Sequence, residues 1–148
     1  MDKSMREELQ KILVEAEMYR RQFESISAQL NIFEGIYTEI GETIDAIEYL
    51  QKIKNKREIL VPLGSNSYIR AELRDMKNVI LGIGANVSLE EPVDEAKNTL
   101  QKRRESIVKE MKKLQELIEK INIKQNELNK RYKELTDKMQ SSNEKSKA

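Results

Sequence analysis

Apolar side chains recur every seven residues along both end regions of this 148-residue chain. In the N-terminal region a second apolar position follows the first after three residues, and neither position carries a charge over six repeats. An average spacing of 3.5 residues places both positions on one side of a helix and indicates a left-handed coiled coil. The two columns are Leu9, Ala16, Phe23, Leu30, Tyr37 and Ile44, and Ile12, Tyr19, Ile26, Phe33, Ile40 and Ile47.

The C-terminal region carries the same repeat. Its first column is Val93, Leu100, Ile107, Leu114, Ile121, Leu128 and Leu135, and its companion column is Lys97, Arg104, Met111, Ile118, Gln125, Tyr132 and Met139. The polar members of the companion column weaken the seam locally, and such residues can fix its register. The predicted helices, residues 5–54 and 92–139, are nearly equal in length, each roughly 70–75 Å. Equal lengths favour an antiparallel coiled coil within one chain.

The centre of the chain follows a different pattern. Most of the glycines and both prolines fall within residues 62–92, and apolar and polar residues alternate there. Alternation around a Gly-Ser-Asn break at 64–66 predicts one β-hairpin, and a turn at Gly84-Ala85 predicts a second. Pro92 suits the first position of the second helix. We therefore expect a single, mainly α domain over 1–148, with two hairpins at 58–90 and a disordered tail at 140–148.

The four short strands cannot stand alone. As a four-stranded sheet they would leave one face uncovered and their edges open, which favours pairing with other subunits. The residues expected to mediate this oligomerisation are Ile59, Val61, Leu63, Ile69, Ala71, Leu73, Val79, Ile80, Leu81, Ile83, Val87 and Leu89.

Composition argues against several classes of function. The chain has no cysteine and no histidine, which removes thiol chemistry and the commonest general base and metal ligand. We expect no enzyme activity, no cofactor and no metal. Its formal net charge of +1 disfavours nucleic-acid binding, although short basic clusters at 52–57 and 102–104 leave a coiled-coil tether in a nucleic-acid complex as an alternative. With no apolar run long enough for a membrane span and no apolar leader, a cytoplasmic location is expected.

The central strands resemble those of a known family. LVPLGSNSYIRAEL (60–73) and VILGIGANVSLEEPVDEA (79–96) are similar to the strand segments of the α class of prefoldin, a chaperone of archaea and eukaryotes. The order of helix, two hairpins and helix resembles the same class, whereas the β class has one hairpin. The composition would also suit a hyperthermophilic archaeon.

The resemblance implies a function and a set of partners. Two α-class and four β-class subunits would form a double β-barrel carrying six coiled coils, whose tips hold unfolded proteins without ATP and pass them to a group II chaperonin. The Gly-rich segment 81–86 suits a hairpin turn better than a phosphate loop. Self-assembly without β-class partners, as a filament or structural scaffold of the same family, is the main alternative.

Client binding is expected where the far ends of the two helices meet. Leu13 and Met18 lie off the seam and should face solvent, and methionine adapts to many apolar shapes. The predicted client-binding residues are Leu9, Ile12, Leu13, Met18, Leu128, Tyr132, Leu135 and Met139.

Overall fold

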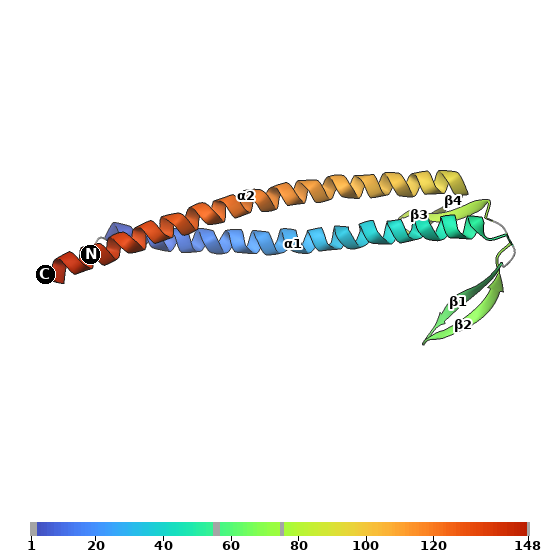
Figure 1. Cartoon of the computed structure of the whole chain (residues 1–148), viewed down its shortest axis with the longest axis horizontal. Coiled ribbons are helices and arrows are strands. Elements are labelled where there is room, and N and C mark those ends of the chain that lie inside the picture. Colours follow the sequence, from blue (N-terminus) through green and yellow to red (C-terminus); the bar gives the residue numbers. More distant parts are fainter. Residues whose placement is uncertain (1–2, 55–56, 75, 148) are drawn as a thin grey trace. The chain divides into compact units, whose positions relative to one another are not determined.

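The computed structural model describes residues 3–54, 57–74 and 76–147 of the chain (Figure 1). Two long helices flank two antiparallel hairpins, which confirms the predicted fold class. The elements in chain order are α1 (Lys3–Lys52), β1 (Glu58–Gly64), β2 (Ser67–Glu72), β3 (Asn78–Gly84), β4 (Val87–Pro92) and α2 (Val93–Lys147).

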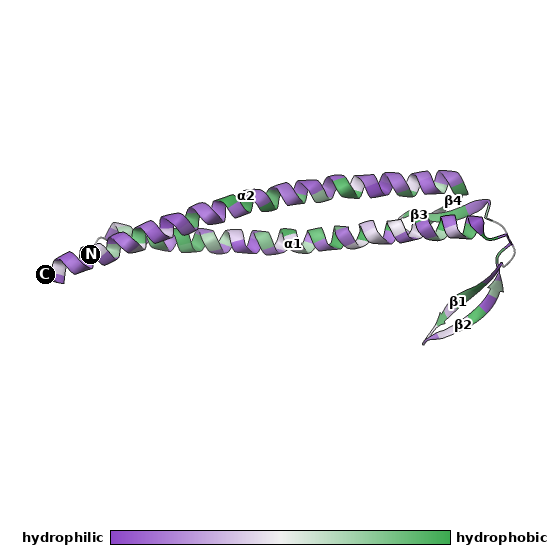
Figure 2. Ribbon diagram, in the orientation of Figure 1, coloured by the Kyte–Doolittle hydropathy of each residue, from purple (hydrophilic) through white to green (hydrophobic). Residues whose placement is uncertain are grey.

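The chain divides into two compact units. The first, here called the helix-end unit, comprises residues 1–34 and 109–148, and the second, the hairpin unit, comprises residues 35–108. In each unit a segment of α1 packs against a segment of α2. Hydrophobic and hydrophilic residues alternate along both helices, and α2 is the more hydrophilic (Figure 2).

The seven-residue columns form the contact between the helices. All twelve seam positions predicted in α1 are buried or half-buried, and so are all those predicted in α2 except Tyr132. In the helix-end unit Ile12 packs with Leu128 and Leu135. In the hairpin unit Ile47 packs with Leu100. The polar seam residues, which are Lys97, Arg104 and Gln125, are half-buried rather than displaced into solvent.

Both hairpins use the same type of turn. The two central residues, Ser65 and Asn66 in one hairpin and Ala85 and Asn86 in the other, all have positive φ between 47° and 59°. Positive φ at both positions is the type I′ pattern, whose twist matches the twist of antiparallel strands. In each hairpin the register shifts on the strand before the turn, between residues 62 and 64 or between residues 82 and 84, which marks a β-bulge.

The two hairpins are copies of one pattern, twenty residues apart. Their strands, register shifts and turns coincide when the first hairpin is moved along the chain by that number. The backbone bonds at their roots match as well: Leu73 N–H donates to the Arg57 carbonyl at 2.6 Å, and Val93 N–H donates to the Lys77 carbonyl at 2.9 Å. The strands form two separate two-stranded sheets, so the expectation of one four-stranded sheet was wrong.

The helix boundaries differ from those predicted. α1 ends at Lys52, and Pro92 is the last residue of β4, where it pairs with Asn78, so α2 begins at Val93. The stretch predicted to be a disordered tail is helical from 140 to 147, and residue 148 lies outside the described residues. Serine hydroxyls in this stretch donate to carbonyls one turn back, as Ser142 does to Lys138 at 2.9 Å. Lysines in the last turn also suit the negative end of the helix dipole.

Candidate functional site

An exposed row of apolar side chains lies near the start of α1. The exposed fractions are 56% for Leu13, 67% for Val14 and 50% for Met18. These three residues, here called the apolar stripe, line shallow surface hollows together with Gln10 and Lys11. Because they lie outside the seam, they remain in solvent when α1 and α2 pack together. Neighbouring apolar side chains left in water are typical of a surface that binds another protein.

The other predicted client-binding residues differ in exposure. Ile12, Leu128 and Leu135 are buried at 4–8% exposure, and Leu9 packs against them. These side chains hold the helices together and present little surface to a client. Tyr132 is 39% exposed, and Met139 is half-buried. Of the eight predicted client-binding residues, only Leu13, Met18 and Tyr132 are therefore exposed.

Val14 is a member of the stripe that sequence reasoning missed. It is the most exposed of the three, at 67%, although valine usually prefers the interior. Its signal was present in the sequence, since Val14 follows Leu13 directly and lies one helical turn before Met18. Those spacings place all three side chains on adjoining parts of the helix surface.

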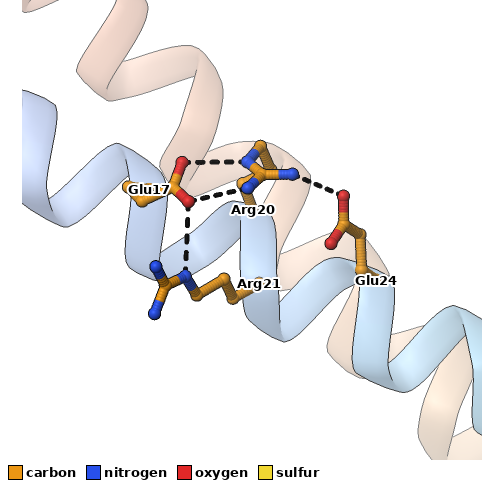
Figure 3. Close-up of polar contacts among 4 residues, drawn as sticks. All are labelled: Glu17, Arg20, Arg21 and Glu24. Atoms are coloured by element: carbon orange, nitrogen blue, oxygen red, sulfur yellow. Dashed lines mark hydrogen bonds and ion pairs between the residues drawn. The ribbon is translucent and has the colours of Figure 1, made fainter.

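Glu17 and Arg21 line one of the hollows of the stripe, and with Arg20 and Glu24 they form a network of charges on α1, which Figure 3 shows. Arg20 donates to both carboxylate oxygens of Glu17, from Nη2 at 2.7 Å and from Nε at 2.9 Å, and from Nη1 to Glu24 at 2.6 Å. Arg21 Nε also donates to Glu17 at 3.3 Å. The hydrogen bonds from Arg20 are the main cause that lowers the pKa of Glu17 from 4.5 to about 2, and Glu17 in turn raises the pKa of Arg20. These groups are exposed, so the network stabilises the helix weakly.

An ion pair joins the two helices beside the seam of the helix-end unit. Arg131 of α2 donates to one carboxylate oxygen of Glu8 from Nε at 3.0 Å and from Nη2 at 2.6 Å. Both side chains reach solvent, so water screens the pair. The contact supports the alignment set by Ile12 and Leu128 rather than creating it.

Hairpin 1 (β1–β2) exposes apolar side chains on both faces. Directly paired residues share a face, so Ile59 with Ala71 and Val61 with Ile69 form one apolar face. Val61 and Ile69 are 37% and 52% exposed. The remaining predicted oligomerisation residues of this hairpin are Leu63, which is exposed at the bulge, and Leu73, which is half-buried and follows the strand.

Hairpin 2 (β3–β4) differs because its own chain covers the β3 part of one face, whereas Leu89, which pairs with Leu81 on that face, is 46% exposed. Leu81, only 7% exposed, packs in a core with Ile47, Ala96 and Leu100, and Val79 packs against that core. Ala96, a position outside the predicted seam, is fully buried there. The other predicted oligomerisation residues of this hairpin are all exposed, and they are Ile80, Ile83, Val87 and Leu89.

Two polar contacts fix hairpin 2 to α2. Arg103 Nη2 donates to the carbonyl of Gly82 at 2.8 Å, and Thr99 Oγ1 donates to the Glu91 carboxylate at 3.0 Å. Hairpin 1 has Ala71 where hairpin 2 has Glu91, so it cannot repeat the second contact.

Each of the two basic clusters considered for nucleic-acid contact contains an arginine that bonds within the chain. Arg103, in the cluster at 102–104, serves the intrachain contact with Gly82. In the cluster at 52–57, residues 55 and 56 lie outside the described residues, and Arg57 donates from Nη1 to the Arg74 carbonyl at 2.5 Å. Both clusters thus contribute an arginine to contacts within the chain.

Two further features, a cluster of metal-ligating side chains and a membrane-spanning helix, are not found among the described residues. Within residues 3–54, 57–74 and 76–147, acidic side chains form no group of three or more that could hold a metal ion. The described helices also include none that is long and apolar enough to cross a membrane.

Comparison with known proteins gives concordant results. The sequence model of the family described as "Prefoldin subunit" matches residues 19–145. The chain is 34% identical over 114 residues to "Prefoldin subunit alpha" of Methanococcus maripaludis strain C7, covering 77% of this chain and 74% of that one. It is 30% identical over 134 residues to the protein of the same name from Pyrococcus horikoshii, covering 90% of this chain and 86% of that one.

A solved structure shares the fold. The cryo-EM structure of filamentous PFD from Methanocaldococcus jannaschii has a TM-score of 0.70 to this chain at 20% sequence identity. The match covers 79% of this chain and 98% of the other.

Proposed function

Because the chain belongs to the prefoldin family, we propose that it is an α-class subunit of an ATP-independent holdase chaperone. In this proposal the hairpins assemble the subunits, the helix ends capture non-native proteins, and the client passes to a group II chaperonin. The archaeal relatives named as α subunits support the class. The exposed apolar stripe at Leu13, Val14 and Met18 is the observation that carries the client-binding step.

Assembly is assigned to the hairpins because a lone two-stranded sheet with exposed apolar faces is marginal in water. Hairpin 1 offers Ile59, Val61, Ile69 and Ala71 on one face. Pairing the edges of its strands with strands of other subunits would satisfy their backbone groups and cover the apolar side chains. A closed barrel would remove the open edges altogether. The expected partners are β-class subunits in an α2β4 hexamer.

Client capture relies on several weak contacts. Covering the three side chains of the stripe, at about 100 Å² each and about 25 cal/mol per Å², gains roughly 7.5 kcal/mol. Association of two molecules costs on the order of 4–15 kcal/mol, so one stripe binds a client poorly. Several coiled coils around one client raise the effective concentration and hold it together. Release then requires no nucleotide, only a partner that offers the client better contacts.

The proposal is tested by removing the stripe. Serine replacements at Leu13, Val14 and Met18 should impair suppression of aggregation when a chemically denatured enzyme is diluted into the chaperone. Light scattering measures the aggregation. The mass of the assembly should stay unchanged, because the stripe lies on the helix-end unit and the strands lie in the hairpin unit.

The matched control replaces three exposed apolar residues elsewhere in the helix-end unit. Ile32, Leu117 and Ile123 are 44–63% exposed, so serine at all three positions removes comparable surface without touching the stripe. The control variant should protect the client as well as wild type. If the stripe variant also protects fully, the assignment of client binding to the stripe is wrong.

A second candidate is a structural filament or scaffold of the same family. The solved structure that shares this fold is described as filamentous, and the exposed apolar residues of both hairpins would allow this chain to pair with itself. Light scattering and electron microscopy of the purified chain separate the two functions. One or two chains per particle would support the hetero-hexamer, whereas long polymers that do not protect a denatured client would support the scaffold.

A further inference from the structure

A guanidinium group lies in the helix seam of the hairpin unit. Arg104 occupies a companion-column position of α2, where its neighbours one repeat away are Lys97 and Met111. Its guanidinium carbon lies 4.1 Å from the centroid of the Tyr37 ring on α1. This is a cation–π contact within one compact unit.

Gly41 provides the room for that group. A Cβ atom at position 41 would lie 2.9 Å from Nη2 and 3.2 Å from Cζ of Arg104. A side chain at this position therefore requires the guanidinium to move away. By contrast, a Cβ at Gly35 would meet nothing within 4 Å. Glycine at position 41 thus serves the close approach of Arg104.

A guanidinium in this place costs desolvation energy. The Nε of Arg104 is buried without a hydrogen-bond partner among the described residues. The ion pairs between described residues also leave Arg104 out. A leucine there would extend the apolar seam and avoid the desolvation of a charge. The best-attested reason to keep a polar group in a coiled-coil seam is that it selects one register.

We propose that Gly41, Tyr37 and Arg104 form a register lock that fixes the alignment of α1 against α2 in the hairpin unit. Moving the helices by one seven-residue repeat would shift them by about 10 Å. The apolar seam residues of α2 would then find equivalent apolar partners, because both columns of α1 are apolar at every repeat. The guanidinium alone would lose both the aromatic ring and the space above Gly41.

The residues that Arg104 would meet after such a shift are known from the repeat. One repeat from Tyr37 lie Leu30 and Ile44, and one repeat from Gly41 lie Glu34 and Glu48. An aliphatic side chain offers no π face to a cation. A glutamate fills the space that Gly41 leaves open, so the guanidinium would have to pair with its carboxylate outside the seam, where water screens the pair.

The core beneath hairpin 2 also favours the observed alignment of α1 and α2. Hairpin 2 is bonded to α2 through Arg103 and Gly82, and it packs on α1 where Leu81 meets Ile47. Any shift of α2 along α1 that carries hairpin 2 with it would therefore separate Leu81 from Ile47. Arg104 thus selects the alignment of the two helices, and its neighbour Arg103 fixes the position of hairpin 2 on α2.

Distance measurements between two spin labels test the lock. The chain holds no cysteine, so Asp45→Cys and Gln101→Cys, both at exposed positions of the hairpin unit, can be labelled specifically. Labelled chains are diluted with unlabelled chains so that only distances within one chain contribute. Wild type should give one distance, and Arg104→Leu and Gly41→Gln should each give a second one.

Two control variants separate the lock from general effects. Lys97→Leu removes another polar seam residue, and Gly35→Gln places the same side chain at a helical glycine with open space around it. Both should keep the single wild-type distance. A single, unchanged distance in Arg104→Leu would overturn the lock, and the same result in Gly41→Gln would overturn the part assigned to Gly41.

Denaturant unfolding gives a second, independent readout. Arg104→Leu should raise the midpoint while the alignment becomes mixed, because the variant gains an apolar contact and loses the selection of register. A lower midpoint with one unchanged distance would show that Arg104 stabilises the fold without selecting a register, and would overturn the proposal. The distance within one chain depends on neither client capture nor assembly, and the midpoints are compared at one low protein concentration, so the lock and the proposed function can fail separately.

Discussion

Leu81 and Val61 occupy equivalent positions in the two hairpins, and their replacement by alanine should have very different effects. Leu81 is 7% exposed in the core with Ile47 and Leu100, whereas Val61 is 37% exposed. Removing three carbons from Leu81 loses about 2.4 kcal/mol of transfer free energy, and the cavity left behind raises the loss to about 3 kcal/mol. Val61→Ala leaves no closed cavity and should cost less than about 1 kcal/mol.

Unfolding in guanidinium chloride, followed by circular dichroism, measures both free energies. Leu60→Ala is the control for residue type, because Leu60 is 63% exposed, and it should also cost less than about 1 kcal/mol. The loss in Leu81→Ala should be independent of protein concentration, since its core lies within one chain. Equal losses for Leu81→Ala and Val61→Ala at low protein concentration would refute the claim that the chain itself buries hairpin 2 at this position and leaves hairpin 1 exposed.

Three further predictions concern single side chains. Gly35→Ala should stabilise the chain by about 1 kcal/mol in denaturant unfolding. Gly41→Ala should stabilise it less, because a Cβ at position 41 meets Arg104 whereas one at position 35 meets nothing. Equal gains in stability would contradict this. Glu17→Gln should slightly lower the thermal midpoint at pH 7. Because the pKa of Glu17 is depressed, the difference in midpoint between wild type and variant should shrink as the pH falls from 4.5 to about 2. A difference that persists below that range would contradict this prediction. Ala85→Gly should raise the thermal midpoint, with a gain of about 1 kcal/mol, because Ala85 has a φ of 49°; an unchanged midpoint would argue against strain there.

The helices could be predicted from the sequence because their signal is local and repeated. Each seven-residue step adds the same evidence, so an exception such as Arg104 does not hide the pattern. The turns were also readable, since Gly-Ser-Asn and Gly-Ala-Asn supply residues that tolerate positive φ. The end of α2 was missed because its polar composition suggested fraying, whereas serine hydroxyls bonded to backbone carbonyls are compatible with a helix that continues to Lys147.

The candidate site was readable only in part. Leu13 and Met18 could be placed in solvent because they fall outside the repeating columns, and the structure exposes both. The same columns contain Ile12 and Leu128, whose burial follows from the seam and leaves them little surface for a client. A seven-residue pattern identifies what faces the partner helix, but the exposure of a residue beside the seam, such as Val14, depends on how far neighbouring side chains cover it.

The unequal roles of the hairpins could not be predicted from strand patterns. Val61 and Leu81 have similar neighbours in sequence, and each lies three residues before a glycine at a type I′ turn. What separates them is tertiary, because Ile47 and Leu100 meet Leu81, and Arg103 holds its hairpin against α2. An internal repeat therefore yields one hairpin with an intrachain core at Leu81 and one whose apolar face is exposed at Val61 and Ile69. That difference leaves hairpin 1 the more available of the two for contact with another subunit.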